Sequence, residues 1–129
     1  MSSALELFGS RVGHIALAQG RATVFFSVAY FYRSKGTPGK DPGSGWTQEA
    51  ELVIDDATLS GALPSLPNTI TEGVLEVGGI KHDLIPVPFR RKVPAVLSLK
   101  FEDGSAIEIS GTRPFLELLG QPIPLEDFS

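Results

Sequence analysis

The sequence predicts an all-β protein, either an antiparallel β-barrel or a β-sandwich of seven to nine short strands, with a short N-terminal helix. Three observations support this class. β-Branched and aromatic residues gather in short runs, turn residues separate these runs at roughly ten-residue spacing, and several runs alternate between apolar and polar side chains. We expect residues 1–129 to form a single domain, because this length suits one hydrophobic core. The alternation alone leaves barrel and sandwich as open alternatives.

The composition argues against several classes of function. The chain has no cysteine, so it has neither a disulfide framework nor a cysteine metal site. Its formal net charge is −4 and its 11 Lys and Arg residues are scattered, with Arg90-Arg91-Lys92 as the one cluster, so we expect no nucleic-acid binding. No signal peptide and no long apolar run are recognisable. We therefore expect a cytoplasmic protein that does not bind a membrane.

The N-terminal segment combines a helix signal with a hairpin signal. Ser3-Ala4-Leu5-Glu6 fits a capping box and Gly9 fits a helix end, which together predict the short helix. Residues 12–19 then read as a strand, and Gln19-Gly20-Arg21 predicts a tight turn. The turn leads into a second strand over residues 22–33.

This second strand is the longest β-forming run in the chain and holds both tyrosines. One of its faces is continuously apolar or aromatic, whereas the other is mixed. Since a half-exposed strand would alternate more cleanly, we expect both faces to be covered, the second by another sheet, a ligand or a subunit. The first face comprises Ala22, Val24, Phe26, Val28, Tyr30 and Tyr32, and the second comprises Thr23, Phe25, Ser27, Ala29, Phe31 and Arg33.

A loop rich in glycine and proline, residues 34–45, precedes the third strand. Its residues 36–41 lack the glycine spacing of a phosphate-binding loop, so we interpret it as a flexible connection. From Trp46 to Asp55 the side chains alternate well, and Gln48 is the one polar residue on the inward face. Asp55-Asp56 then predicts a turn, followed by a short strand over residues 57–63.

Two hairpins have registers that the sequence can specify. Gly78-Gly79 allows a two-residue turn that pairs Val77 with Ile80 and Glu76 with Lys81. In the second hairpin, a three-residue loop over residues 102–104 places the apolar side chains of both strands on one face. A two-residue Asp-Gly turn would mix the faces, so we predict the three-residue loop with Gly104 in the left-handed region.

The remaining segments are expected to be extended. Alternating prolines over residues 85–94 favour an edge strand or a connection, because proline supplies no backbone donor. Residues 115–119 fit either a helix or a strand, and we expect a strand because a β partner precedes them. Residues 121–128 should continue as an extended tail.

The sequence contains no convincing catalytic constellation. Asp55 and Asp56 are neighbours and would point to opposite faces of a strand, and the serines lack a nucleophile-elbow motif. His14 and His82 are the only histidines and lack metal-ligand spacing, although the first hairpin places His82 on an apolar face. We therefore expect no catalytic residue, no metal site and no cofactor.

The aromatic residues are the remaining functional signal. Tyrosine and tryptophan combine apolar area with a polar tip, which suits interfaces and pockets. We expect a non-catalytic binding or interaction protein that uses the aromatic face of residues 22–33 and the adjacent glycine-rich loop. The expected partner is a small apolar ligand or a protein. We also expect the chain to form a homodimer. The alternative is a small-barrel enzyme or carrier with a cavity lined by Tyr30, Tyr32, Trp46 and His82. The full set of candidate binding residues is Phe25, Phe31, Tyr30, Tyr32, Trp46 and His82.

Overall fold

A computed structural model describes residues 2–38 and 40–128, with side chains through residue 125, and contains nine β-strands and no helix in that part of the chain. The prediction of an all-β antiparallel protein is confirmed. No described segment is a helix that could cross a membrane. The strands are β1 (Ser2–Ala18), β2 (Arg21–Ser34), β3 (Gly43–Ser60), β4 (Asn68–Val77), β5 (Ile80–His82), β6 (Leu84–Val87), β7 (Phe89–Arg90), β8 (Pro94–Phe101) and β9 (Ala106–Phe128).

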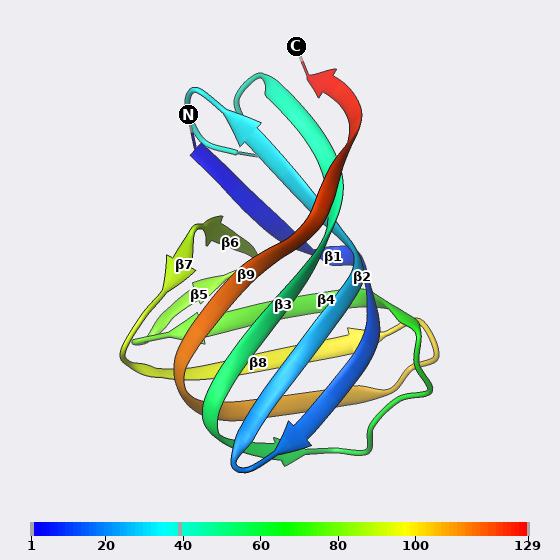
Figure 1. Cartoon of the computed structure of the whole chain (residues 1–129), viewed down its shortest axis with the longest axis vertical. Helices are drawn as coiled ribbons and strands as arrows, with labels where there is room; N and C mark the ends of the chain where they lie inside the picture. Colours follow the sequence, from blue (N-terminus) through cyan, green and yellow to red (C-terminus); the bar gives the residue numbers. More distant parts are fainter. Residues whose placement is uncertain (1, 39, 129) are drawn as a thin grey trace.

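The nine strands belong to one sheet (Figure 1). Its order is β5-β4-β8-β9-β3-β2-β1-β6, with β7 paired to β9 and a further pairing between β4 and β1. The strands are not uniformly short, since β1, β3 and β9 have 17, 18 and 23 residues. β-Bulges explain this difference, because a bulge lets a strand bend and continue past residues that would otherwise end it.

The predicted N-terminal helix is wrong. Residues of β1 pair on both sides instead, so that Leu5 lies opposite Phe31 of β2 and opposite Ile85 of β6. A helix of one or two turns is marginal by itself, whereas a central strand satisfies its backbone groups on both sides. Gly9, expected to end the helix, has a φ of 84° in the irregular part of β1.

The long aromatic strand changes its buried face part-way along, contrary to the continuous face expected from the sequence. Phe26 lies opposite Ala50 of β3, but the next pair is Ala29 with Gln48, so β2 carries one extra residue there. An extra residue inverts the alternation beyond it. The buried apolar residues of β2 are therefore Ala22, Val24, Phe26, Ala29 and Phe31.

Both hairpin registers predicted from the sequence are confirmed. Val77 pairs with Ile80 and Glu76 with Lys81. In the second hairpin, Leu99 pairs with Ile107 and Leu97 with Ile109. The backbone N–H of Phe101 donates to Ser105, which closes the three-residue loop, and Gly104 has a φ of 87°. The alternation of apolar and polar side chains thus predicts the register of both hairpins correctly.

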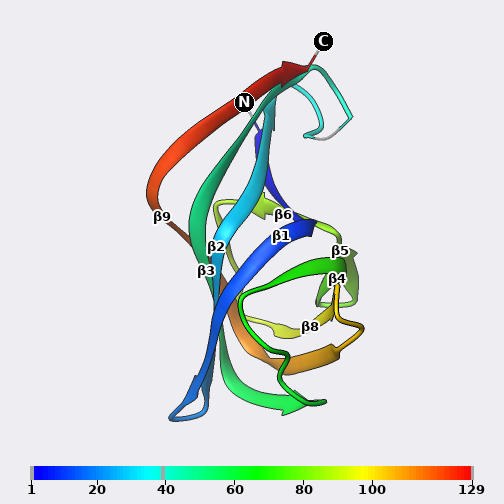
Figure 2. The same cartoon turned by 90° about the vertical axis from the view of Figure 1, so that its right-hand side faces the viewer.

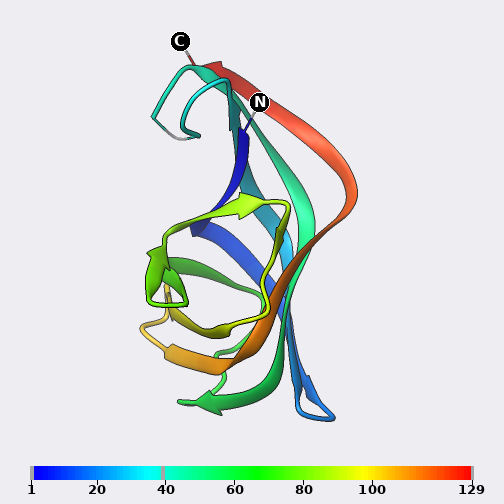
Figure 3. The same ribbon diagram turned by 90° about the vertical axis from the view of Figure 1, so that its left-hand side faces the viewer.

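Four strands extend beyond the body of the molecule at one end. Side views show the start of β1, the end of β2, the start of β3 and the end of β9 rising together above the part that holds β4, β5 and β8 (Figures 2 and 3). Pairing confirms the arrangement, because Ser2 lies opposite Ser34, Ser34 opposite Gly43, and Gly43 opposite Phe128. The loop between β2 and β3 lies at this end, and its residue 39 is outside the described residues. Trp46 lies on this four-stranded extension.

Candidate functional site

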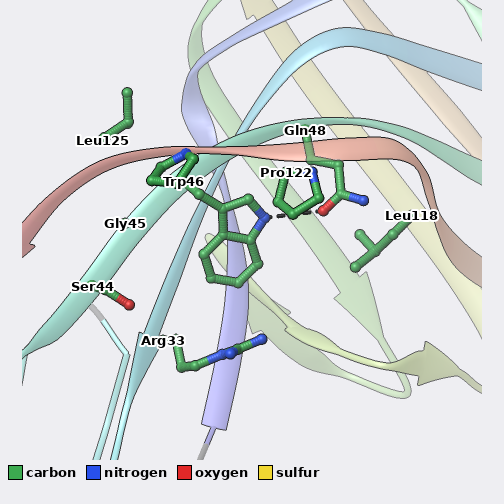
Figure 4. Close-up of a pocket in the computed structure, with 9 residues that line it drawn as sticks. Arg33, Ser44, Gly45, Trp46, Gln48, Leu118, Pro122 and Leu125 are labelled. Carbon is green, nitrogen blue, oxygen red and sulfur yellow. Dashed lines mark hydrogen bonds between the residues drawn. The ribbon is translucent and has the colours of Figure 1, made fainter.

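A pocket of about 410 Å³ lies on the extension beside Trp46 (Figure 4). Side chains of β2, β3 and β9 form it, with the indole of Trp46 at its centre. The volume falls within the range of small-molecule sites, which is about 300–1,000 Å³. Its lining residues are Arg33, Ser44, Gly45, Trp46, Gln48, Leu118, Pro122, Pro124 and Leu125.

The indole of Trp46 contacts both an aromatic ring and a cation. Phe31 lies opposite Trp46 across the β2–β3 ladder, and their rings stack with centroids 5.2 Å apart and an interplanar angle of 13°. Arg33, two residues further along the same face of β2, places its guanidinium carbon 5.2 Å from the centroid of the indole. Trp46 is only 9% exposed as a result.

Gln48 fixes the polar edge of the same indole. The Trp46 Nε1–H donates to Oε1 of Gln48 at 3.0 Å, and Nε2 of Gln48 donates to the backbone carbonyl of Gly120 at 3.1 Å. Gly120 has a φ of 65° and lies in a bulge of β9. Gln48, the polar residue on the inward face of residues 46–54, therefore links Trp46 to that bulge.

The bulge in β9 forms the apolar wall of the pocket. Thr47 pairs with Ile123, but Glu49 pairs with Leu119, so β9 has extra residues between these positions. Pro122, within these extra residues, lines the pocket together with Leu118, Pro124 and Leu125. Leu125 is 53% exposed, which leaves apolar surface at the mouth. The wall thus combines the half-buried Leu118 with exposed apolar side chains.

Of the predicted binding residues, the structure brings Phe31 and Trp46 together. Tyr30 and Tyr32 alternate with Phe31 and therefore lie on the opposite face of β2. The hydroxyl of Tyr32 donates to Oε1 of Glu6 at 3.2 Å on that face. Neither tyrosine lines the pocket at Trp46.

Phe25 and His82 lie away from the pocket as well. Phe25 is half-buried and lies opposite His14 of β1 and Glu51 of β3. The ring of His82 packs edge-on against Phe89, with centroids 5.9 Å apart. The six predicted residues are therefore spread over several regions of the sheet and do not form one site.

Residues that sequence reasoning did not single out complete the pocket. From the sequence, Arg33 is only the last residue on the mixed face of residues 22–33, and Gln48 is only a polar interruption of an apolar face. Gly120-Gln121-Pro122 gave the only usable signal, because an isolated glycine within a strand pattern often marks a bulge. The β9 wall depends on a long-range pairing with β3 that local sequence does not specify.

A titratable group lies on the opposite face of the extension. Burial raises the pKa of Glu6 above its ordinary value of 4.5, the hydrogen bond from Tyr32 opposes part of this rise, and the negative charge of Asp83 adds to it. This carboxylate is part of the tyrosine face and is not a lining residue of the pocket.

The described residues contain no group of three or more His, Cys, Asp or Glu side chains placed to hold a metal ion. In the pocket, the described lining residues include one cation, Arg33, and no carboxylate or imidazole. The pocket can therefore offer a ligand apolar contact and an ion pair.

Comparison of the chain with protein-family models, with curated proteins and with solved structures finds no match.

Proposed function

We propose that this protein is a non-catalytic recognition domain that binds a small ligand with an apolar body and an anionic group in the pocket at Trp46. The observation that carries this proposal is the fixed indole beside one arginine and an apolar wall. Tryptophan supplies a large apolar surface with a defined orientation, which is typical of ligand-binding sites.

The pocket is preorganised. Stacking on Phe31 and the hydrogen bond to Gln48 hold the indole before any ligand arrives. A site whose side chains are already ordered loses less conformational entropy on binding. This arrangement favours a ligand that packs against the small exposed part of the indole and against the β9 wall.

The charge of the pocket indicates the class of ligand. Arg33 is exposed and its guanidinium covers the indole, so an incoming anionic group can pair with it at the mouth. Leu118, Pro122 and Leu125 offer apolar contact to the rest of the ligand. Among the residues whose side chains are described, the lining has none suited to general acid–base chemistry, which supports recognition over catalysis.

Two dyes of nearly the same shape test this proposal. Anilinonaphthalene sulfonate has an apolar body and an anionic group, and phenylnaphthylamine has the body without the anion. Trp46 is the one tryptophan of the chain, so energy transfer from it reports a bound dye, and variants of the lining residues report whether that dye lies in the pocket. We expect saturable binding of both dyes, and Arg33→Gln should weaken the sulfonate roughly tenfold while sparing phenylnaphthylamine.

A matched pair of leucines provides the control. Leu125 lines the pocket and is 53% exposed, whereas Leu63 lies outside it and is 47% exposed. Leu125→Ser should weaken both dyes roughly fivefold, and Leu63→Ser should leave both unchanged. Equal effects of the two serine variants, or no saturable binding of either dye, would refute the proposal.

The alternative, a small-barrel enzyme or carrier, has less support. We propose that the pairing of Arg11 with Thr69 and of Val12 with Asn68 closes the sheet into a barrel whose interior is filled by core side chains. Val12, Phe26 and Leu97 have no exposed surface, which supports a filled interior. Of the four residues expected to line a carrier cavity, Trp46 is the one that lines the described pocket.

A homodimer is a second candidate, favoured by the edge of β9. Beyond Leu116 this strand pairs with β3, and no described strand pairs with its other side. Pro122 and Pro124 remove backbone donors there, so we propose contact through side chains rather than added strands. Light scattering tests this with two isoleucines that are each 63% exposed: Ile123→Glu should split a dimer and Ile80→Glu should not. A monomeric parent protein would rule out the dimer and leave the pocket proposal standing.

A further inference from the structure

A groove lined by cations lies away from the pocket, where the β1–β2 turn, β3, β7 and the first part of β9 meet. It consists of two adjoining hollows of about 290 Å³ and 350 Å³ that share Arg21, Asp55 and Arg113. We refer to them together as the basic groove. Five of the eleven lysine and arginine residues line it, namely Arg21, Arg90, Arg91, Lys92 and Arg113.

The charge of the basic groove is opposite to that of the whole protein. Its five cations are accompanied by three carboxylates, those of Asp55, Asp56 and Glu117, whereas the chain has a net charge of −4. A local excess of positive charge in a concave site attracts anions. A phosphate monoester carries between about −1.5 and −2 at neutral pH, which matches this excess.

Asp55 orients two of the arginines. Its Oδ1 lies 2.9 Å from Nε of Arg21, and its Oδ2 lies 3.5 Å from Nε of Arg113. Arg113 also reaches Asp56, with Nη2 and Oδ2 3.6 Å apart. The contact with Asp55 uses the Nε of Arg21, so the two Nη groups of that guanidinium extend beyond the ion pair.

Aromatic rings hold the other two arginines. The guanidinium carbon of Arg90 lies 4.1 Å from the centroid of Phe115, and that of Arg91 lies 4.6 Å from the centroid of Phe89. A guanidinium that lies over a ring directs its N–H groups outward in its own plane, where they can donate to an oxyanion. Four arginines are thus held by ion pairs or rings before any ligand binds.

The backbone at the basic groove is held in an unfavourable conformation. Among the described residues, the non-glycine residues with positive φ are Gln19, Asp56 and Arg113, at 54°, 48° and 52°, and all three line the same hollow. Gln19 belongs to the β1–β2 turn, where this conformation is common. Asp56 and Arg113 lie in irregular stretches of β3 and β9, where such residues cost free energy and cluster at binding sites.

We propose that the basic groove binds the phosphate group of a small phosphorylated molecule. Arg21 and Arg113, oriented by Asp55, and Arg90, stacked on Phe115, supply the N–H donors. Planar guanidinium groups match the oxygens of a phosphate with paired hydrogen bonds. This inference uses residues separate from the Trp46 pocket and does not depend on the proposed function.

Calorimetric titration of the full chain with pyrophosphate tests the inference. We expect saturable binding that weakens as salt is added, because salt screens the attraction. Arg113→Gly should weaken binding roughly tenfold without lowering the midpoint of thermal unfolding, since glycine accepts the φ of 52°. Arg90→Gln, which leaves the backbone unchanged, should weaken binding by a similar factor.

Lys100→Gln is the matched control. Lys100 pairs with Glu72 outside the basic groove, so this variant removes one positive charge elsewhere. It should keep the affinity for pyrophosphate within roughly twofold of the parent protein. Absence of saturable binding, or equal losses in Lys100→Gln and Arg113→Gly, would overturn the inference.

Phospholipid headgroups carry the same phosphate chemistry, so vesicles form the second arm of the test. Vesicles of phosphatidylglycerol and phosphatidylcholine should leave the protein in the supernatant after sedimentation. Cosedimentation that pyrophosphate does not compete away would show a membrane-surface site and contradict a small-molecule site.

Discussion

The indole N–H of Trp46 donates a hydrogen bond to Oε1 of Gln48 at 3.0 Å. The same amide reaches across to β9 and donates to Gly120. One side chain therefore satisfies the polar edge of a nearly buried ring and fixes the bulge that forms the apolar wall of the pocket. The two hydrogen bonds can be separated by mutation, because one uses the amide oxygen and the other the amide nitrogen.

Gln48→Leu should destabilise the protein by about 1–3 kcal/mol, since it leaves the indole N–H and the Gly120 carbonyl without their partner. Gln48→Glu keeps the acceptor for Trp46 and loses the donor to Gly120, so its cost should be smaller, about 1 kcal/mol. Urea denaturation followed by tryptophan fluorescence measures both. Equal losses in the two variants would contradict the role assigned to the oxygen.

Ser10 should be more important than an ordinary surface serine. It has no exposed surface, its Oγ donates to the carbonyl of Glu6 at 2.6 Å, and it accepts the N–H of Tyr30 at 3.1 Å. Where the β1–β2 pairing is irregular, the Ser10 hydroxyl thus bonds the Glu6 carbonyl and the Tyr30 N–H in place of a backbone partner. Ser10→Ala should cost about 1–3 kcal/mol, because a buried backbone N–H loses its acceptor.

Ser27→Ala is the comparison for Ser10→Ala. The Oγ of Ser27 is 3.4 Å from the carbonyl of Arg11, a long contact at a half-buried site. Its loss should cost less than about 1 kcal/mol. A larger loss in Ser27→Ala than in Ser10→Ala, measured by thermal or urea unfolding, would be inconsistent with the bridging role of Ser10.

Local alternation predicted those parts of the fold where strands are regular. The hairpin at Gly78-Gly79 and the three-residue loop before Ser105 have the expected registers. The inward face of β3 is also as expected, including Gln48. In these segments the turn chemistry and the two faces point to the same register, so a local reading suffices.

Bulges account for the parts that could not be predicted. The extra residue between Phe26 and Ala29 moves Phe31 to the buried face and the two tyrosines away from Trp46, and no local signal marks it. Likewise, Asp55-Asp56 does not end its strand, since β3 continues to Ser60 with Asp56 at a φ of 48°. The pocket and the basic groove both depend on such irregularities and on pairings distant in sequence.

Glu6→Gln should stabilise the protein at neutral pH. The pKa of Glu6 is raised in the folded state, so the folded protein holds this proton more tightly than the unfolded chain does. Stability therefore falls as pH rises from the ordinary value of 4.5 through the raised pKa, and the loss is complete above that pKa. Glutamine avoids this loss and still offers an oxygen to Tyr32.

The pH dependence distinguishes this mechanism from a general effect of the substitution. The advantage of Glu6→Gln should shrink as pH falls toward 4.5 and be largest at neutral pH. Asp83→Asn should also raise stability at neutral pH, because it removes the repulsion that contributes to the raised pKa. An advantage of Glu6→Gln that is constant between acidic and neutral pH would exclude the proposed cause.

Gly111→Ala should be among the most damaging single-methyl changes. A Cβ at position 111 would lie 2.3 Å from the carbonyl oxygen of Asp55 and 2.6 Å from Cγ2 of Ile54. The backbone cannot move aside as a side chain can, so we expect the free energy of unfolding to fall by about 2–3 kcal/mol or more.

Gly79→Ala is the control. Position 79 has a φ of 82° and no atom within 4 Å of the added Cβ, so only backbone strain of about 1–2 kcal/mol applies. Because Gly111→Ala pushes on the segment that carries Asp55, it should also weaken pyrophosphate binding, whereas Gly79→Ala should not. Unfolding midpoints and calorimetric titration of the two variants measure both effects, and a Gly111→Ala protein with normal stability would show that this close approach is not a constraint on the fold.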